Sequence, residues 1–153
     1  MTRATRWFED YRVGDVAEFG NYLVTETEIV GFATQYDPQA FHTDPEAAKG
    51  SIFGGLVASG WHTAAVMMRL LAEHHLSPES SLGSPGVDEL RWTKPVRPGD
   101  RLRERVTVTE VVPSRSKPDR GVVKSFTELL NQDGDVVMTV RGMVMLRRRP
   151  EGT

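Results

Sequence analysis

The sequence contains no cysteine, which excludes disulfide bonds and thiol catalysis and leads us to expect a reducing, cytoplasmic compartment. It also has no apolar run near the roughly 18 residues that a membrane-spanning helix requires. Residues 1–15 lack the apolar stretch of a secretory signal. Because the formal net charge is only −2, composition gives no reason to expect a nucleic-acid partner.

The length and composition of the chain are typical of one folded domain. The chain has 153 residues, of which 39% are hydrophobic and 26% are charged, so it can bury a substantial core. No group of histidines and carboxylates has the spacing of metal ligands. The glycine-rich stretch 50–55 lacks the lysine and the hydroxyl group of a P-loop. We therefore expect a single domain over residues 1–153, with no metal and no bound cofactor.

A short helix is predicted to place an acid at its end. Thr25 and Glu28 fit a capping box, in which the two side chains pair with each other's backbone amides. Apolar residues then recur at helical spacing as far as Tyr36. Pro38 disfavours helical geometry at the residue before it, so the helix should stop near Asp37. The Asp37 carboxylate is thus expected at the start of a loop.

A histidine follows this acid at close range. His42 lies five residues after Asp37 in the predicted loop, where it can fold back to form an acid–base pair with the carboxylate. Asp44 is expected to cap the next helical turn, with Pro45 at its first position. A purely structural alternative is that Asp37 caps a turn before Pro38 and that His42 pairs with Asp44.

A second helix is predicted over residues 60–74, with Ser59 as its N-cap. Most of its residues are apolar, so other elements should cover most of its sides. The backbone amide of Gly60 has no acceptor within such a helix. Together with the helix dipole, that amide is suited to stabilising a developing negative charge.

Polar residues of this second helix form a narrow stripe of His62, Arg69 and Glu73. We expect a structural or interfacial role for His62 and a local ion pair between Arg69 and Glu73. His74 and His75 are expected to form a solvated helix end.

Five segments have the alternation and turn signals of strands, at residues 16–24, 86–92, 102–112, 122–130 and 135–148. Short connections between successive strands favour an antiparallel sheet. The simplest architecture that covers the apolar helix is a curved antiparallel sheet around it, an α+β fold.

Residues 37–42, Asp-Pro-Gln-Ala-Phe-His, resemble the signature of the MaoC-like dehydratase family, the R-specific enoyl-CoA hydratases of the hot-dog fold. That signature is an aspartate, any residue, Asn-Pro, an apolar residue and a histidine. The resemblance continues through Gly60 and into residues 89–100, and so covers most of the chain. Gln39 and Ala40 replace the asparagine and the proline, and Ser59 stands where the family often has histidine.

The resemblance implies an (R)-specific enoyl-CoA hydratase or 3-hydroxyacyl-CoA dehydratase that works as a homodimer or a dimer-based oligomer. Its substrate would be a thioester of CoA or of acyl carrier protein. Asp37 and His42 would be catalytic, and the backbone NH of Gly60 would form the oxyanion site. Two alternatives are a hot-dog acyl-CoA thioesterase and a non-catalytic acyl-CoA-binding subunit.

Overall fold

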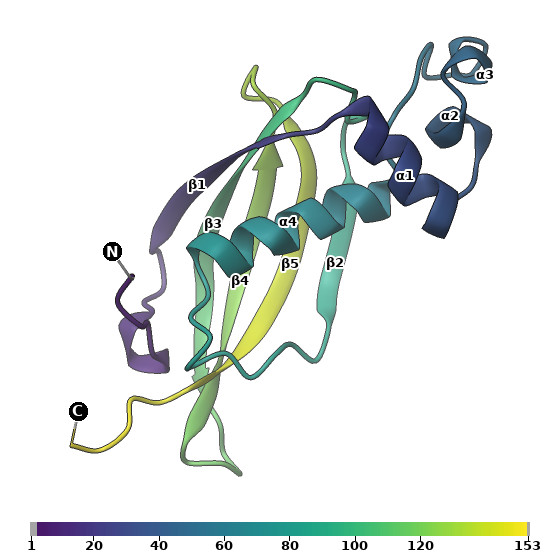
Figure 1. Ribbon diagram of the computed structural model, residues 1–153. Helices are drawn as coiled ribbons and strands as arrows, with labels where there is room; N and C mark the ends of the chain where they lie inside the picture. Colours follow the sequence, from purple (N-terminus) through teal and green to yellow (C-terminus); the bar gives the residue numbers. More distant parts are fainter. Residues whose placement is uncertain (1–2, 153) are drawn as a thin grey trace.

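Five antiparallel strands form one curved sheet in the computed structural model, which describes residues 3–152 (Figure 1). The strands lie in the order β1-β3-β4-β5-β2, so β1 and β2 are the two edges. Their bounds are β1 (Val16–Leu23), β2 (Val87–Trp92), β3 (Arg101–Pro113), β4 (Arg120–Leu130) and β5 (Val136–Arg147). All five predicted strands are confirmed to within two residues at either end.

Helix α4 (Gly60–His74) runs across the concave face of this sheet, as predicted (Figure 1). Its inner side carries Val66 and Leu70, which belong to a core cluster with buried residues of β3, β4 and β5. A bulge in β1 at Gly20 makes room for this contact. Gly20 has a φ of 94°, and an added Cβ would lie 2.9 Å from the methyl groups of Leu70. Glycine is therefore required for β1 to approach α4 this closely.

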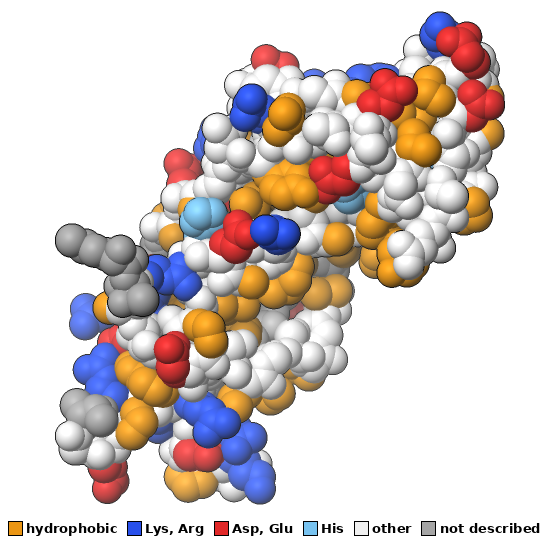
Figure 2. All heavy atoms as spheres, in the orientation of Figure 1, with side chains coloured by type: hydrophobic (Ala, Val, Ile, Leu, Met, Phe, Trp, Pro, Cys, Tyr) orange, Lys and Arg blue, Asp and Glu red, His pale blue; other side chains and the backbone are white. Residues whose placement is uncertain are grey.

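The outer side of α4 is not covered within the protomer. Trp61 and Met68 are 61% and 47% exposed, and hydrophobic side chains gather along this face of the molecule (Figure 2). The expectation that most sides of α4 would be covered is therefore wrong for the single chain, because the sheet reaches only one side of it.

Three helices sit together beyond the N-terminal end of α4 (Figure 1): α1 (Glu26–Tyr36), α2 (Ala40–Thr43) and α3 (Pro45–Lys49). A short 3₁₀ turn, η1 (Phe8–Asp10), precedes β1. Helix α1 ends at Asp37 as predicted. His42, however, does not lie in an irregular loop but in the single turn of α2. Among residues 3–152, no helix combines the length and the apolar character needed to cross a membrane.

Two local predictions need correction. The capping box of α1 forms only in part: the Glu28 amide donates to Thr25 Oγ1 over 3.1 Å, but the Glu28 carboxylate bonds to other side chains. His75 is buried instead of solvated, and it packs between the rings of Tyr11 and Phe19. Burial, followed by the charges of two nearby arginines, lowers the pKa of His75 to about 4.

An acidic residue lies inside the core. Glu104 on β3 is 0% exposed, and neither of its carboxylate oxygens has a hydrogen-bond partner in the described part of the chain. Its cross-strand neighbours are Phe19 and Leu129. Burial without a partner disfavours the charged form and raises the pKa of Glu104 to about 9. The carboxyl group is therefore protonated at neutral pH.

We expect the free energy of unfolding to fall as pH rises from 6.5 to 8.5. The unfolded chain releases the Glu104 proton near its ordinary pKa of 4.5, whereas the folded chain retains it until about pH 9. One retained proton corresponds to a slope of about 1.4 kcal/mol per pH unit. His75 opposes this slope mainly below pH 7, since its unfolded pKa is 6.5. Urea unfolding at several pH values measures the effect.

The slope should flatten in Glu104→Gln, which cannot release a proton. Glu110→Gln, at an exposed position on the same strand, should keep the parent slope and serves as the control. Equal parent stability at pH 6.5 and pH 8.5 would contradict the assignment of a protonated Glu104.

Candidate active site

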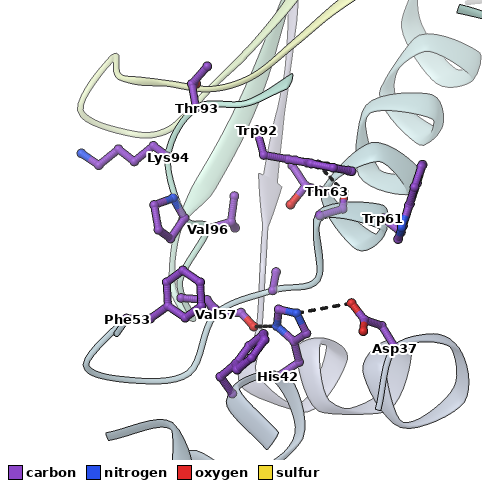
Figure 3. Close-up of a pocket in the computed structure, with 14 residues that line it drawn as sticks. Asp37, His42, Phe53, Val57, Trp61, Thr63, Trp92, Thr93, Lys94 and Val96 are labelled. Atoms are coloured by element: carbon purple, nitrogen blue, oxygen red, sulfur yellow. Dashed lines mark hydrogen bonds and ion pairs between the residues drawn. The ribbon is translucent and has the colours of Figure 1, made fainter. Parts of the chain in front are cut away.

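The structure brings the predicted acid and histidine together. Asp37 Oδ2 lies 3.3 Å from His42 Nε2, although the two residues belong to different elements (Figure 3). Asp37 terminates α1, where its amide bonds to the carbonyl of Ala33 over 2.8 Å. His42 does not pair with Asp44, whose carboxylate instead caps α3 by accepting from two backbone amides. The structural alternative for His42 is therefore wrong.

A backbone carbonyl fixes the orientation of the His42 ring. His42 is 6% exposed, and its Nδ1 lies 2.6 Å from the carbonyl oxygen of Val57. Because a carbonyl oxygen only accepts hydrogen bonds, Nδ1 carries the hydrogen in this pair. The other ring nitrogen, Nε2, is then directed toward Asp37 (Figure 3).

Two side chains donate to the Asp37 carboxylate. Gln39 Nε2 donates to Oδ1 over 2.6 Å, and Ser59 Oγ donates to Oδ2 over 2.7 Å. The hydrogen bond from Gln39 contributes most to lowering the pKa of Asp37. The hydrogen bond from Ser59 and the charge that His42 carries when protonated also lower it, against the opposing effect of burial. The carboxylate is therefore ionised at neutral pH.

Ser59 has a second role that sequence analysis missed. As predicted, it caps α4, since its Oγ accepts from the Trp61 amide over 3.3 Å. The same hydroxyl donates to Asp37, so it joins the start of α4 to the end of α1. The sequence indicated the cap, but no local pattern connects residue 59 with a carboxylate 22 residues earlier. Gln39 was visible only as a departure from the family signature.

Gly60 begins α4 beside the same side chains. Within residues 3–152, its amide has no hydrogen-bond acceptor. An added Cβ would lie 2.3 Å from the Trp92 ring, so only glycine fits here. Trp92 Nε1 also donates to the Gly60 carbonyl oxygen over 2.8 Å. The edge strand β2 thus fixes the first residue of α4, a contact that sequence analysis did not predict.

Asp37, His42 and Gly60 all line one cavity of about 420 Å³. Aromatic and aliphatic side chains form much of its wall, including Phe53 and Trp92 (Figure 3). Within residues 3–152, no three histidine or carboxylate side chains gather in a way that could hold a metal ion. The cavity therefore combines an apolar wall with an acid, an imidazole and an unpaired amide, as expected of a small-molecule site.

A family model described as the MaoC like domain matches residues 11–128. The chain belongs to the MaoC-like dehydratase family. Its fold also matches a crystal structure of the MaoC-like dehydratase from Rhodospirillum rubrum, with 45% identity and a TM-score of 0.88 over 95% of this chain and 99% of that one. The hot-dog fold is shared with an R-hydratase from Pseudomonas aeruginosa, at 24% identity and a TM-score of 0.73 over 94% of this chain and 86% of that one.

Relatives of this MaoC-like chain carry names of hydratases and dehydratases. The mesaconyl-CoA hydratase of Cereibacter sphaeroides is 34% identical over 97% of this chain, which spans only 43% of that hydratase. The 3-hydroxybutyryl-CoA dehydratase of Methylorubrum extorquens is 27% identical over 88% of this chain and 83% of its own length. An uncharacterized Bacillus subtilis protein, YdeM, is 27% identical over 92% of this chain and 98% of its own length.

We expect Gln39→Ala to raise the pKa of Asp37. The substitution removes the donor that contributes most to stabilising the charged carboxylate, so protonation becomes easier. Carbon-13 NMR titration of the aspartate side chains measures the shift. Gln35→Ala, an exposed glutamine of α1, is the control and should leave the Asp37 titration unchanged. An unchanged or lower pKa in Gln39→Ala would contradict the role of this donor.

Proposed function

We propose that the protein is an (R)-specific enoyl-CoA hydratase, which adds water across the double bond of a 2-enoyl thioester, or catalyses the reverse dehydration of a 3-hydroxyacyl thioester. The observation that carries the proposal is the 3.3 Å approach of Asp37 to His42 in a cavity that also contains the free amide of Gly60. Hydration requires a group that holds the water molecule and a donor to the thioester oxygen. Asp37 and His42 can hold the water, and the Gly60 amide can be the donor.

The Asp37–His42 pair is suited to holding a water molecule. In the neutral form whose hydrogen is on Nδ1, His42 presents the lone pair of Nε2 beside the negatively charged Oδ2 of Asp37. Two acceptors this close repel each other unless one donor molecule bridges both of them. A water molecule can donate one hydrogen to each acceptor, which leaves its oxygen lone pairs free to attack C3. As the C3–O bond forms, the pair takes up one proton from the water and delivers a proton to C2, so the substrate gains the OH at C3 and the hydrogen at C2 of one water molecule.

The Gly60 amide is suited to the charge that develops elsewhere on the substrate. During attack at C3, the thioester oxygen gains enolate character. An unpaired N–H group at the start of α4 can donate to that oxygen, with the dipole of the helix reinforcing the interaction. The donor is already fixed by Trp92 and Ser59, so little reorganisation is needed when the charge appears.

The proposed substrate is a thioester of CoA or of acyl carrier protein. The names of the mesaconyl-CoA hydratase and the 3-hydroxybutyryl-CoA dehydratase support a CoA thioester. The apolar wall of the cavity suits an alkyl or alkenyl group, since burial of apolar surface favours its binding.

We expect Asp37→Asn and His42→Ala each to lower kcat with crotonyl-CoA by roughly a hundredfold or more. Loss of one acid–base group typically has an effect of this size, which corresponds to about 2.7 kcal/mol. Loss of the enoyl absorbance measures the rate. Glu46→Gln, an exposed position on α3, should retain the parent rate. No turnover by the parent, or full activity in either variant, would refute the catalytic assignment.

The products separate this proposal from its alternatives. A hot-dog thioesterase would release the free thiol of CoA, which a thiol reagent detects, whereas a hydratase removes the enoyl absorbance and leaves the thioester intact. A non-catalytic acyl-CoA-binding subunit would bind crotonyl-CoA without either change.

We also propose that the chain forms a homodimer. Strand β2 is an unpaired edge of the sheet, and the outer side of α4 leaves Trp61 and Met68 exposed. A second copy that continued the sheet at β2 would bring another α4 beside this one and cover both apolar surfaces.

Light scattering should therefore give about twice the 17.1 kDa mass of one chain. Met68→Lys places a charge in the proposed contact and should shift the population toward monomer, because an unpaired charge is costly to bury. Ser116→Lys adds the same charge in the exposed β3–β4 connection and should leave the mass unchanged. A monomeric parent protein would refute the dimer.

A further inference from the structure

A second polar cluster lies at the start of α4, outside the cavity that contains Asp37. His62 Nε2 lies 3.0 Å from Glu28 Oε1, and the Tyr22 hydroxyl donates to the same oxygen over 2.5 Å. His62 is 3% exposed, and its ring stacks on Phe32 with centroids 4.9 Å apart. The three polar side chains come from β1, α1 and α4, so the cluster joins three elements.

The hydrogens in this cluster can be assigned. His62 Nδ1 has no hydrogen-bond partner within residues 3–152, so the contact with Glu28 depends on Nε2 alone. Because a carboxylate only accepts, Nε2 carries the hydrogen and donates it. Glu28 thus receives two donors on one oxygen. These two donors explain why the Glu28 carboxylate does not form the second hydrogen bond of the capping box of α1.

The cluster completes a two-point attachment between α1 and α4. At one end of α1, the Ser59 hydroxyl bonds to Asp37. Near the other end, Glu28 bonds to His62, which is only two residues beyond Gly60. Nine residues separate Glu28 from Asp37, a helical rise of about 13 Å. Ile29 packs α1 against the core, and the two polar attachments add one fixed contact near each end of the helix.

We propose that Glu28 and His62 are positioning residues, which set the direction of α1 and so hold the Asp37 carboxylate at a fixed place relative to the Gly60 amide. Neither side chain lines the cavity that contains Asp37 and His42. Their effect on turnover rests on the function proposed above. Small displacements of reacting groups cost rate because the productive geometry is visited less often.

Replacement of Glu28 tests this role by separating geometry from charge. Glu28→Ala removes the acceptor and should lower kcat with crotonyl-CoA roughly tenfold, with KM changed less than about twofold, since substrate contacts remain. Glu28→Gln keeps an oxygen that can accept from both Tyr22 and His62, so it should recover most of the rate. Glu26→Ala is the control, because Glu26 lies two residues earlier in the described α1 and is exposed without an ion pair.

A second measurement tests the contact between Glu28 and His62 without relying on turnover, so it applies even if the parent protein is not a hydratase. Hydrogen–deuterium exchange of the peptide that contains the first turn of α4 should be faster in Glu28→Ala and unchanged in Glu28→Gln and Glu26→Ala. If Glu28→Ala does not fold, His62→Phe is used, which keeps a ring against Phe32 but removes the donor to Glu28, and it should raise the exchange rate in the same way.

The outcomes distinguish the two proposals. An active parent with unchanged kcat and unchanged exchange in Glu28→Ala would overturn the positioning role and leave the hydratase proposal intact. Equal losses of kcat in Glu28→Ala and Glu28→Gln would also overturn it, because the geometric contact would then not be what matters. An inactive parent would overturn the hydratase proposal, while the exchange rates would still decide whether the contact fixes the helix.

Discussion

The hydrogen bond from the Ser59 hydroxyl to Asp37 is the contact on which the rest of the site depends. A single oxygen atom both caps α4 and holds the carboxylate that ends α1. Without it, the acid on one helix and the free amide of Gly60 on the other would have no direct connection. Helix capping, ordinarily a local stabilising device, here fixes the distance between two functional groups.

The sheet holds this junction in place through its core and through its edge. Apolar residues on the inner side of α4 fix the height of the helix above the strands. Trp92, the last residue of β2, then fixes the rotation and position of the first turn by a hydrogen bond and by contact with Gly60. The site is therefore built where a rigid helix start meets a rigid strand end, and the short helices α1 and α2 bring the acid and the imidazole to it.

Much of the fold could be predicted from the sequence, because strand alternation, proline positions and capping residues are local signals. The end of α1 at Asp37 followed from Pro38, and the start of α4 followed from Ser59. The pairing of Asp37 with His42 was also within reach, since five residues separate them. Contacts such as Trp92 with Gly60 or Glu28 with His62 join residues more than 30 positions apart, and no local pattern encodes them. The burial of Glu104 and His75 was likewise hidden, because polar residues are normally assigned to the surface.

The indole of Trp92 has a consequence for how the protein responds to events at its periphery. This side chain belongs to an edge strand with an open row of backbone groups, yet its ring rests against the amide-bearing residue at the heart of the cavity. Because the ring bonds to the Gly60 carbonyl and lies against that residue, a change in the twist of β2 would act directly on Gly60. A change at the edge of the sheet can therefore reach the cavity through the side chain of Trp92.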